Sequence, residues 1–127
     1  MIFKRIGTGK KGEDLAFSYL KEQGYRIIGR NYKTAQGEID IIGDDGGCIS
    51  FVEVRSMNAG GPGSPEYTIN RRKQGQVTKV ALSYIKKYRL EDRKSRFDVV
   101  CIEDVDGISP KIRLIRNAFE LDRRYSY

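Results

Sequence analysis

Apolar residues recur along this chain with two spacings, one typical of helices and one typical of strands. In residues 12–23 they return every three or four positions, which predicts a helix that ends at Gly24. The same spacing predicts a longer helix over residues 69–90, and Gly75 weakens its first turns enough for a later start. The apolar stripe of this second helix consists of Val77, Val80, Ala81, Tyr84, Ile85 and Tyr88.

Five further segments have the alternating or continuous apolar pattern of strands. These strands are predicted at residues 25–32 (with a bulge at Gly29), 37–43, 48–55, 97–102 and 111–116. The run Asp44-Asp45-Gly46-Gly47 is typical of a hairpin turn, because glycine tolerates the positive φ that such turns need. The order α-β-β-β-α-β-β predicts an α/β fold in which helices flank a central mixed sheet.

A length of 127 residues fits a single domain, 1–127. We expect a loose basic arm at 1–9, a flexible loop rich in glycine and proline at 56–67, and a loosely docked tail at 118–127. The sequence has no apolar run of signal-peptide length near its beginning and no segment as apolar as a membrane span. These features predict a cytoplasmic protein that does not enter a membrane.

The net charge of +7 favours a polyanionic partner, either nucleic acid or an anionic membrane surface. The charge is concentrated in residues 71–96, which hold ten Lys or Arg and two acids, a net charge of +8. The rest of the chain therefore carries −1. Such concentration indicates a phosphate-binding face more strongly than the total charge does.

The chain has no histidine, which excludes Ser-His-Asp and Cys-His hydrolases as well as histidine-based zinc sites and nucleases. Its two cysteines, Cys48 and Cys101, lie in apolar stretches without the paired spacing of zinc ligands. We expect buried free thiols, and the sequence leaves a disulfide open.

Two carboxylates stand inside otherwise apolar strands, Asp40 between two isoleucines and Glu53 between two valines. A buried carboxylate is costly unless it has a cation, a proton or a partner. A turn centred on Asp45-Gly46 would place Asp40 opposite Phe51 and Glu38 opposite Glu53. Asp40 and Glu53 would then be diagonal neighbours about 7–8 Å apart at the backbone.

This arrangement suits a hard cation such as Mg²⁺, since carboxylates can converge on it and a bound water can become the nucleophile. Arg55 follows Glu53 on the same strand face and could hold a phosphate or stabilise developing charge. The alternative is that Asp40 and Glu53 are ordinary residues on the exposed face of an amphipathic hairpin, with Arg55 paired to one of them.

Several motifs together resemble the YraN family, small bacterial proteins of restriction-endonuclease-like fold similar to Holliday junction resolvases. The resemblance covers about residues 10–103 and depends most on the combination of GEIDII with FVEVR. The motifs are Gly12-Glu13, GRNYKTAQGEIDIIG at 29–43, FVEVR at 51–55, a helix containing Lys73, and RFDVV at 96–100.

The resemblance implies an active site of the PD-(D/E)xK type. Asp40 would be its metal-binding aspartate and Glu53 its second acid, while Glu13 would assist the metal from the first helix. Arg55 occupies the position usually held by lysine, and arginine does not readily give or take a proton. Lys73 could supply the missing ammonium. For Glu13, stabilisation of the helix N-terminus is an equally good interpretation.

The expected function is therefore a Mg²⁺- or Mn²⁺-dependent endonuclease that cuts nucleic acid, DNA and branched DNA in particular. A homodimer is implied by the resemblance alone. Phosphate contacts are expected from the basic helix, through Arg71, Arg72, Lys73, Gln76 and Lys79. Two alternatives stay open: a nucleic-acid-binding module without catalysis on the same fold, and a protein-interaction domain whose basic helix docks an acidic partner.

Overall fold

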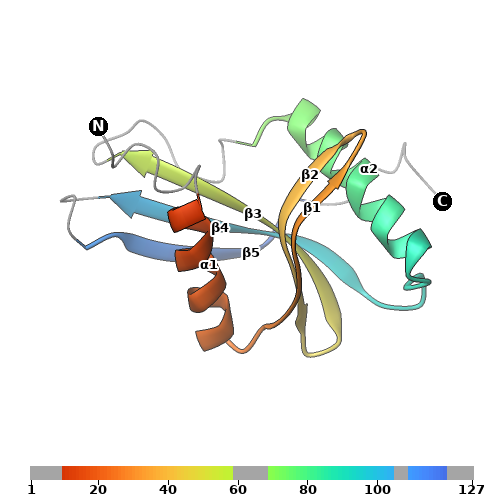
Figure 1. Cartoon of the computed structure of the whole chain (residues 1–127), viewed down its shortest axis with the longest axis horizontal. Coiled ribbons are helices and arrows are strands. Elements are labelled where there is room, and N and C mark those ends of the chain that lie inside the picture. Colours follow the sequence, from red (N-terminus) through yellow and green to blue (C-terminus); the bar gives the residue numbers. More distant parts are fainter. Residues whose placement is uncertain (1–9, 59–68, 105–108, 120–127) are drawn as a thin grey trace.

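The computed structural model describes residues 10–58, 69–104 and 109–119, which contain two helices and five strands (Figure 1). The order of the elements is the predicted one. They are α1 (Lys10–Glu22), β1 (Arg26–Thr34), β2 (Gly37–Asp45), β3 (Cys48–Asn58), α2 (Arg71–Lys87), β4 (Ser95–Asp104) and β5 (Lys111–Phe119).

The predicted loop and the predicted tail both begin too early. The predicted loop at 56–67 begins too early, because β3 continues to Asn58 beside β4. The predicted tail at 118–127 likewise loses its first two residues to β5. The remainder of that loop and tail, together with the predicted arm at 1–9, lies outside the described residues.

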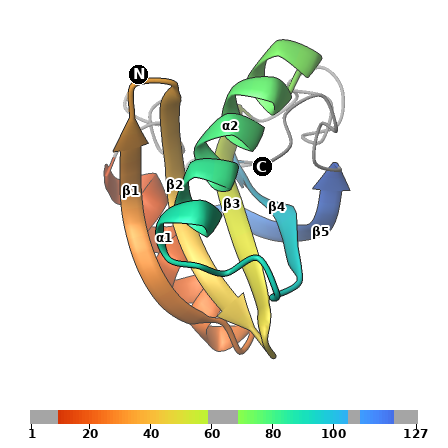
Figure 2. The ribbon, with the colours of Figure 1, turned by 90° about the vertical axis from the view of Figure 1, so that its right-hand side faces the viewer.

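The five strands form one mixed sheet in the order β1-β2-β3-β4-β5. Neighbouring strands are antiparallel except β3 and β4, which are parallel and therefore need a crossover connection. The chain between them contains α2, which crosses one face of the sheet, whereas α1 lies behind the other face (Figure 2). The prediction of helices flanking a central mixed sheet is thus confirmed.

Each helix covers its own apolar core. The core on the α2 side includes Ile39, Ile42 and Phe51, which pack against Val80 and Tyr84. The core on the α1 side is formed by Ala16, Leu20, Tyr25, Ile41, Val52, Val54, Val100 and Ile102. Because both faces of the central strands are buried, polar side chains on those strands need specific partners.

The turn between β2 and β3 shifts the predicted register. Gly46 and Gly47 form it, with φ values of 61° and 98°, so Asp45 pairs with Cys48 and Ile42 pairs with Phe51. The prediction that Asp40 faces Phe51 and Glu38 faces Glu53 is wrong, because Asp45 belongs to the strand rather than to the turn. The regular pairing of β2 with β3 extends as far as Ile41 with Val52, and Asp40 lies just beyond this point.

Neither helix in the described part of the chain has the length and hydropathy of a membrane-spanning segment. Cys101 is buried, as expected, whereas Cys48 is only half-buried, and both are free thiols.

Candidate active site

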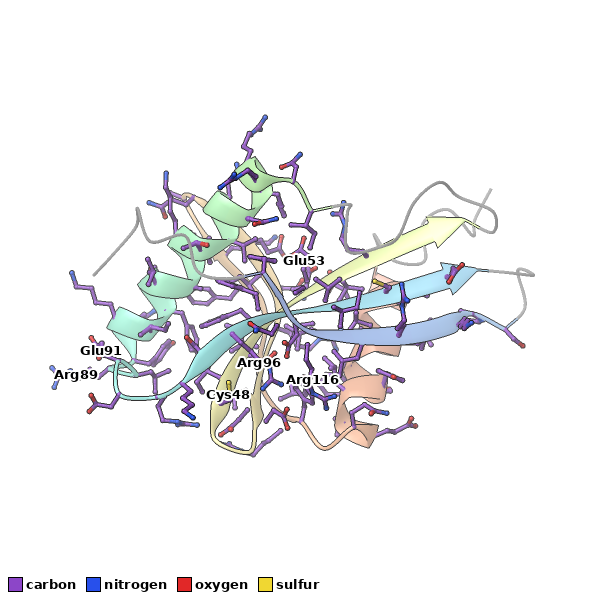
Figure 3. The ribbon with its side chains drawn as sticks, turned by 180° about the vertical axis from the view of Figure 1, so that it is seen from behind. Cys48, Glu53, Arg89, Glu91, Arg96 and Arg116 are labelled. Atoms are coloured by element: carbon purple, nitrogen blue, oxygen red, sulfur yellow. The ribbon has the colours of Figure 1, made fainter. Side chains whose placement is uncertain are left out.

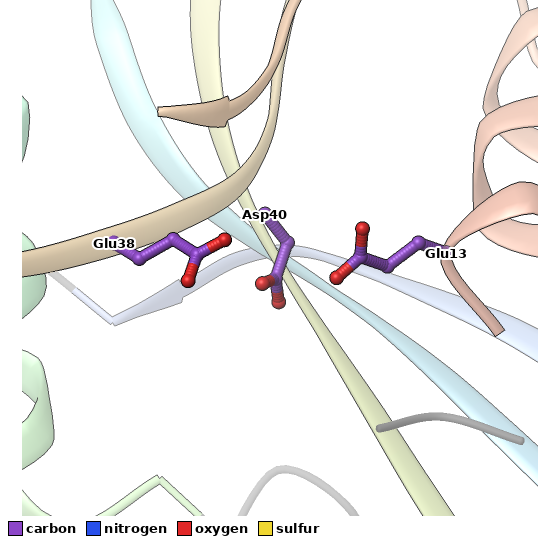
Figure 4. Close-up of side chains that lie close together, drawn as sticks. All are labelled: Glu13, Glu38 and Asp40. Atoms are coloured by element: carbon purple, nitrogen blue, oxygen red, sulfur yellow. The ribbon is translucent and has the colours of Figure 1, made fainter. Parts of the chain in front are cut away.

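Three carboxylates from two elements converge on one side of the sheet. Glu13 comes from the first turn of α1, and Glu38 and Asp40 come from β2 (Figure 4). One oxygen from each lies within 4.8 Å of the others, and all three residues are half-buried. Carboxylates this close together repel one another unless a cation or a proton lies between them. We call this group the carboxylate cluster.

Glu38 is a member of the cluster that the sequence motifs did not single out. It lies two positions before Asp40 on β2, and alternate residues of a strand share a face, so its spacing could have revealed it. The predicted register placed Glu38 opposite Glu53 rather than beside Glu13.

Asp40 is fixed by the backbone of the neighbouring strand. The amide of Val54 donates a hydrogen bond of 2.8 Å to Asp40 Oδ2. Burial is the main cause that raises the pKa of Asp40 to about 7, and the charge of Glu53 is the next. Glu13 and Glu38 raise it further, whereas the hydrogen bond from Val54 opposes the shift.

Glu53 is buried in β3, with 6% of its surface exposed, and lies near the beginning of α2 (Figure 3). Its Oε2 atom is 3.4 Å from Lys73 Nζ and 4.0 Å from Arg55 Nη1. Its Oε1 atom is buried without a hydrogen-bond partner in the described part of the chain. Burial raises the pKa of Glu53, although Lys73 and Arg55 lower it.

The structure thus joins all five predicted catalytic residues into one network. Asp40 belongs to the carboxylate cluster with Glu13 and is close enough to Glu53 for their charges to interact. Glu53 in turn contacts the two cations, Arg55 and Lys73. The alternative that Glu53 is an ordinary residue on an exposed face does not hold, because its side chain is buried.

Lys73 owes its place to the start of α2. Asn70 caps the helix, and its side chain accepts a hydrogen bond of 2.9 Å from the backbone amide of Lys73. This cap explains why the helix begins at Arg71 and brings Lys73 to Glu53 in its first turn. The predicted phosphate-contacting residues Arg71, Arg72, Gln76 and Lys79 are all exposed. The helix contains no acidic residue.

The model of the uncharacterised protein family UPF0102 matches residues 12–102, a segment that contains every residue of this network. The chain belongs to the UPF0102 family. The resemblance to YraN proteins inferred from the motifs is thereby confirmed, since they form the same family. The mixed sheet with its two helices is consistent with a restriction-endonuclease-like arrangement.

Similar UPF0102 proteins come from several bacteria. That of Trichlorobacter lovleyi is 45% identical over 115 residues, covering 90% of this chain and 91% of the relative. That of Syntrophus aciditrophicus is 42% identical over 127 residues, covering 95% and 97%. That of Persephonella marina is 43% identical over 114 residues, covering 90% and 94%. UPF0102 relatives therefore match this chain over nearly its full length.

Proposed function

We propose that this UPF0102 protein is a metal-dependent endonuclease that hydrolyses phosphodiester bonds of nucleic acid, with DNA as its substrate. The observation that carries the proposal is the carboxylate cluster beside Glu53, whose buried Oε1 has no partner among the described residues. Such a group of acids is costly without a counter-charge, and oxygen ligands are those that Mg²⁺ and Mn²⁺ prefer.

The donor set fits a divalent cation. Glu13, Glu38 and Asp40 would hold it, and Glu53 would complete the site from β3. When bound, Mg²⁺ would lower the pKa of a coordinated water and neutralise charge on the phosphate. The hydrogen bond from Val54 fixes the orientation of Asp40, so this carboxylate would need little reorientation to bind the ion.

The two cations next to Glu53, Arg55 and Lys73, would act on the phosphate and on the attacking water. Arg55 presents a planar guanidinium that suits a phosphate oxygen. Lys73 presents an ammonium 3.4 Å from Glu53, where it could orient the attacking water or contact the scissile phosphate. We assign the orientation of the attacking water to Lys73, because arginine does not readily give or take a proton.

The basic helix α2 would bind the nucleic-acid backbone. Its exposed residues Arg71, Arg72, Gln76 and Lys79 lie on either side of Lys73 along the helix. An acid-free helix surface is suited to a polyanion and would make binding sensitive to salt.

The test is cleavage of branched, duplex and single-stranded DNA with Mg²⁺ or Mn²⁺, comparing wild type with Asp40→Asn. We expect Asp40→Asn to lower the rate at least about 100-fold, since a ligand of the catalytic ion is lost. Glu91→Gln, which changes an exposed acid after α2, is the matched control and should cleave normally.

The outcomes separate the proposal from its two rivals. Salt-sensitive binding without cleavage would identify a binding module on the same fold. Absence of DNA affinity at physiological salt would favour a protein-interaction domain. Cleavage that persists in Asp40→Asn would show that the activity arises elsewhere.

A further inference from the structure

The β1–β2 hairpin exchanges its two faces at a single residue pair, Asn31 and Asp40. Alternate residues of a strand normally point to the same face. Yet Ile39 packs in the core on the α2 side, whereas Ile41 packs in the core on the α1 side. The side-chain alternation of β2 therefore breaks at Asp40, the residue between them.

The neighbouring strand breaks its alternation at the same level. Arg30 faces α1, where its guanidinium lies 4.8 Å from the ring centroid of Phe17 and donates to Asp14 at 2.7 Å. Two residues later, Tyr32 packs edge-on against Tyr84 of α2, with ring centroids 5.1 Å apart. The side-chain alternation of β1 and β2 therefore breaks at the same level of the sheet.

The exchange is a rotation rather than an inserted residue. Arg30 pairs with Ile41 on one side of it and Tyr32 pairs with Ile39 on the other, without a shift in register. Asn31, between these pairs, has a φ of 53°, in the left-handed region. Asparagine is one of the few residues besides glycine that enter this region readily.

The exchange determines where Asp40 points. Because Ile39 faces the α2 side, Glu38 and Asp40 are directed towards α1, where Glu13 lies. Beyond the pair of Ile41 with Val52, the Val54 amide donates to the side chain of Asp40.

We infer that Asn31 is a positioning residue whose left-handed backbone turns Asp40 into the carboxylate cluster. Its side chain is exposed and has no hydrogen bond or ion pair within the described ranges, so its contribution is the backbone conformation. The consequence for metal binding rests on the proposed function, whereas the placement of Asp40 does not.

The test compares Asn31→Val with Asn31→Gly by two measurements, hydrogen exchange of the Val54 amide and Mn²⁺ affinity. Valine disfavours the left-handed region, so we expect the protection of the amide and the affinity each to fall about tenfold in Asn31→Val, equivalent to about 1.4 kcal/mol. Glycine adopts that region freely, so Asn31→Gly should keep both within about twofold of wild type. If Asn31→Val does not fold, Asn31→Ala provides the same comparison.

Arg89→Val is the matched control, because Arg89 also has a left-handed φ, of 57°, but lies at the far end of α2. It should leave exchange of the Val54 amide unchanged relative to the most protected amides. Normal Val54 exchange in Asn31→Val, or an equal loss in Asn31→Gly or Arg89→Val, would overturn the inference. If wild type binds no Mn²⁺ but the exchange results are as expected, the positioning role stands and the proposed function fails.

Discussion

Asp40 is a residue at which negative charge is crowded. It interacts with three other carboxylates, and burial removes the water that would otherwise screen them. Its pKa rises from 3.8 to about 7 on folding, so between these values the folded protein binds a proton that the unfolded chain has lost. The free energy of unfolding of the metal-free protein therefore falls as the pH rises towards 7, and stays low above it.

Replacing this carboxyl with an amide should restore the free energy of unfolding that the metal-free protein loses as the pH rises. Asp40→Asn keeps an oxygen for the Val54 amide and removes the charge, so we expect it to stabilise the metal-free protein by about 1–3 kcal/mol at pH 8. At pH 5, where Asp40 already holds a proton, the two proteins should differ little. Urea denaturation in the presence of a chelator measures both values. An equal effect at the two pH values would contradict this account.

Glu38 provides a second prediction for a single residue. Glu38→Gln removes one negative charge from the carboxylate cluster and should weaken Mn²⁺ binding about tenfold or more, as measured by calorimetry. Glu22→Gln, which changes an exposed acid at the end of α1, is the control. Unchanged affinity in Glu38→Gln would remove Glu38 from the ligand set.

At the scale of elements, α2 has a distinct outer stripe. Five of its exposed residues recur at intervals of four and three, so they lie along one side of the helix, opposite the residues buried against the sheet. This stripe consists of Arg72, Gln76, Lys79, Ser83 and Lys86. Three of the five residues are cations and none is an acid, a surface that suits the negative charge of a nucleic-acid backbone.

Removing two of these cations should weaken the salt dependence of nucleic-acid binding without disturbing the fold. For Arg72→Ala with Lys79→Ala, we expect the slope of log affinity against log salt to decrease by about 2 on duplex DNA. Fluorescence anisotropy between about 50 and 200 mM salt measures the slope. Lys111→Ala, on the exposed side of β5, should leave it unchanged. A slope unaffected by the double substitution would place the nucleic acid elsewhere.

The order of the elements followed from the sequence because their apolar spacing is strong, whereas the hairpin register did not. The run Asp44-Asp45-Gly46-Gly47 allows more than one pair of turn residues, and a shift of one turn position changes every partner of β2 on β3. The left-handed Asn31 was also beyond prediction, since an asparagine within a strand pattern usually keeps the negative φ of its neighbours.

At the scale of the whole molecule, a buried acid other than Glu53 connects several strands of the sheet through hydrogen bonds. Asp98 is fully buried and accepts hydrogen bonds from Tyr25, Ser50, Arg96 and the backbone amide of Asn117. These donors come from β3, β4, β5 and the residue that precedes β1. Asp98 shares with Asp40 and Glu53 the pattern of an acid inside an apolar strand. The apolar pattern alone could not separate it from them, because the difference lies in its hydrogen-bond donors.

Asp98→Ala should therefore lower the free energy of unfolding. Loss of the carboxylate leaves the Arg96 charge and several donors without their partner, and we expect a cost of about 3–5 kcal/mol. Chemical denaturation measures the loss, while Mn²⁺ affinity of the folded variant should stay within about twofold of wild type. A large fall in Mn²⁺ affinity would mean that Asp98 also influences the carboxylate cluster.

The parallel pairing of β3 with β4 has a consequence for the nascent chain. Glu53 lies beside Val99, a residue 46 positions later, so its strand lacks one neighbour until the ribosome has synthesised β4. The carboxylates, Arg55 and Lys73 are all synthesised before that neighbour. A polypeptide emerging from the ribosome would thus carry every chemical group of the site before the sheet that positions them is complete.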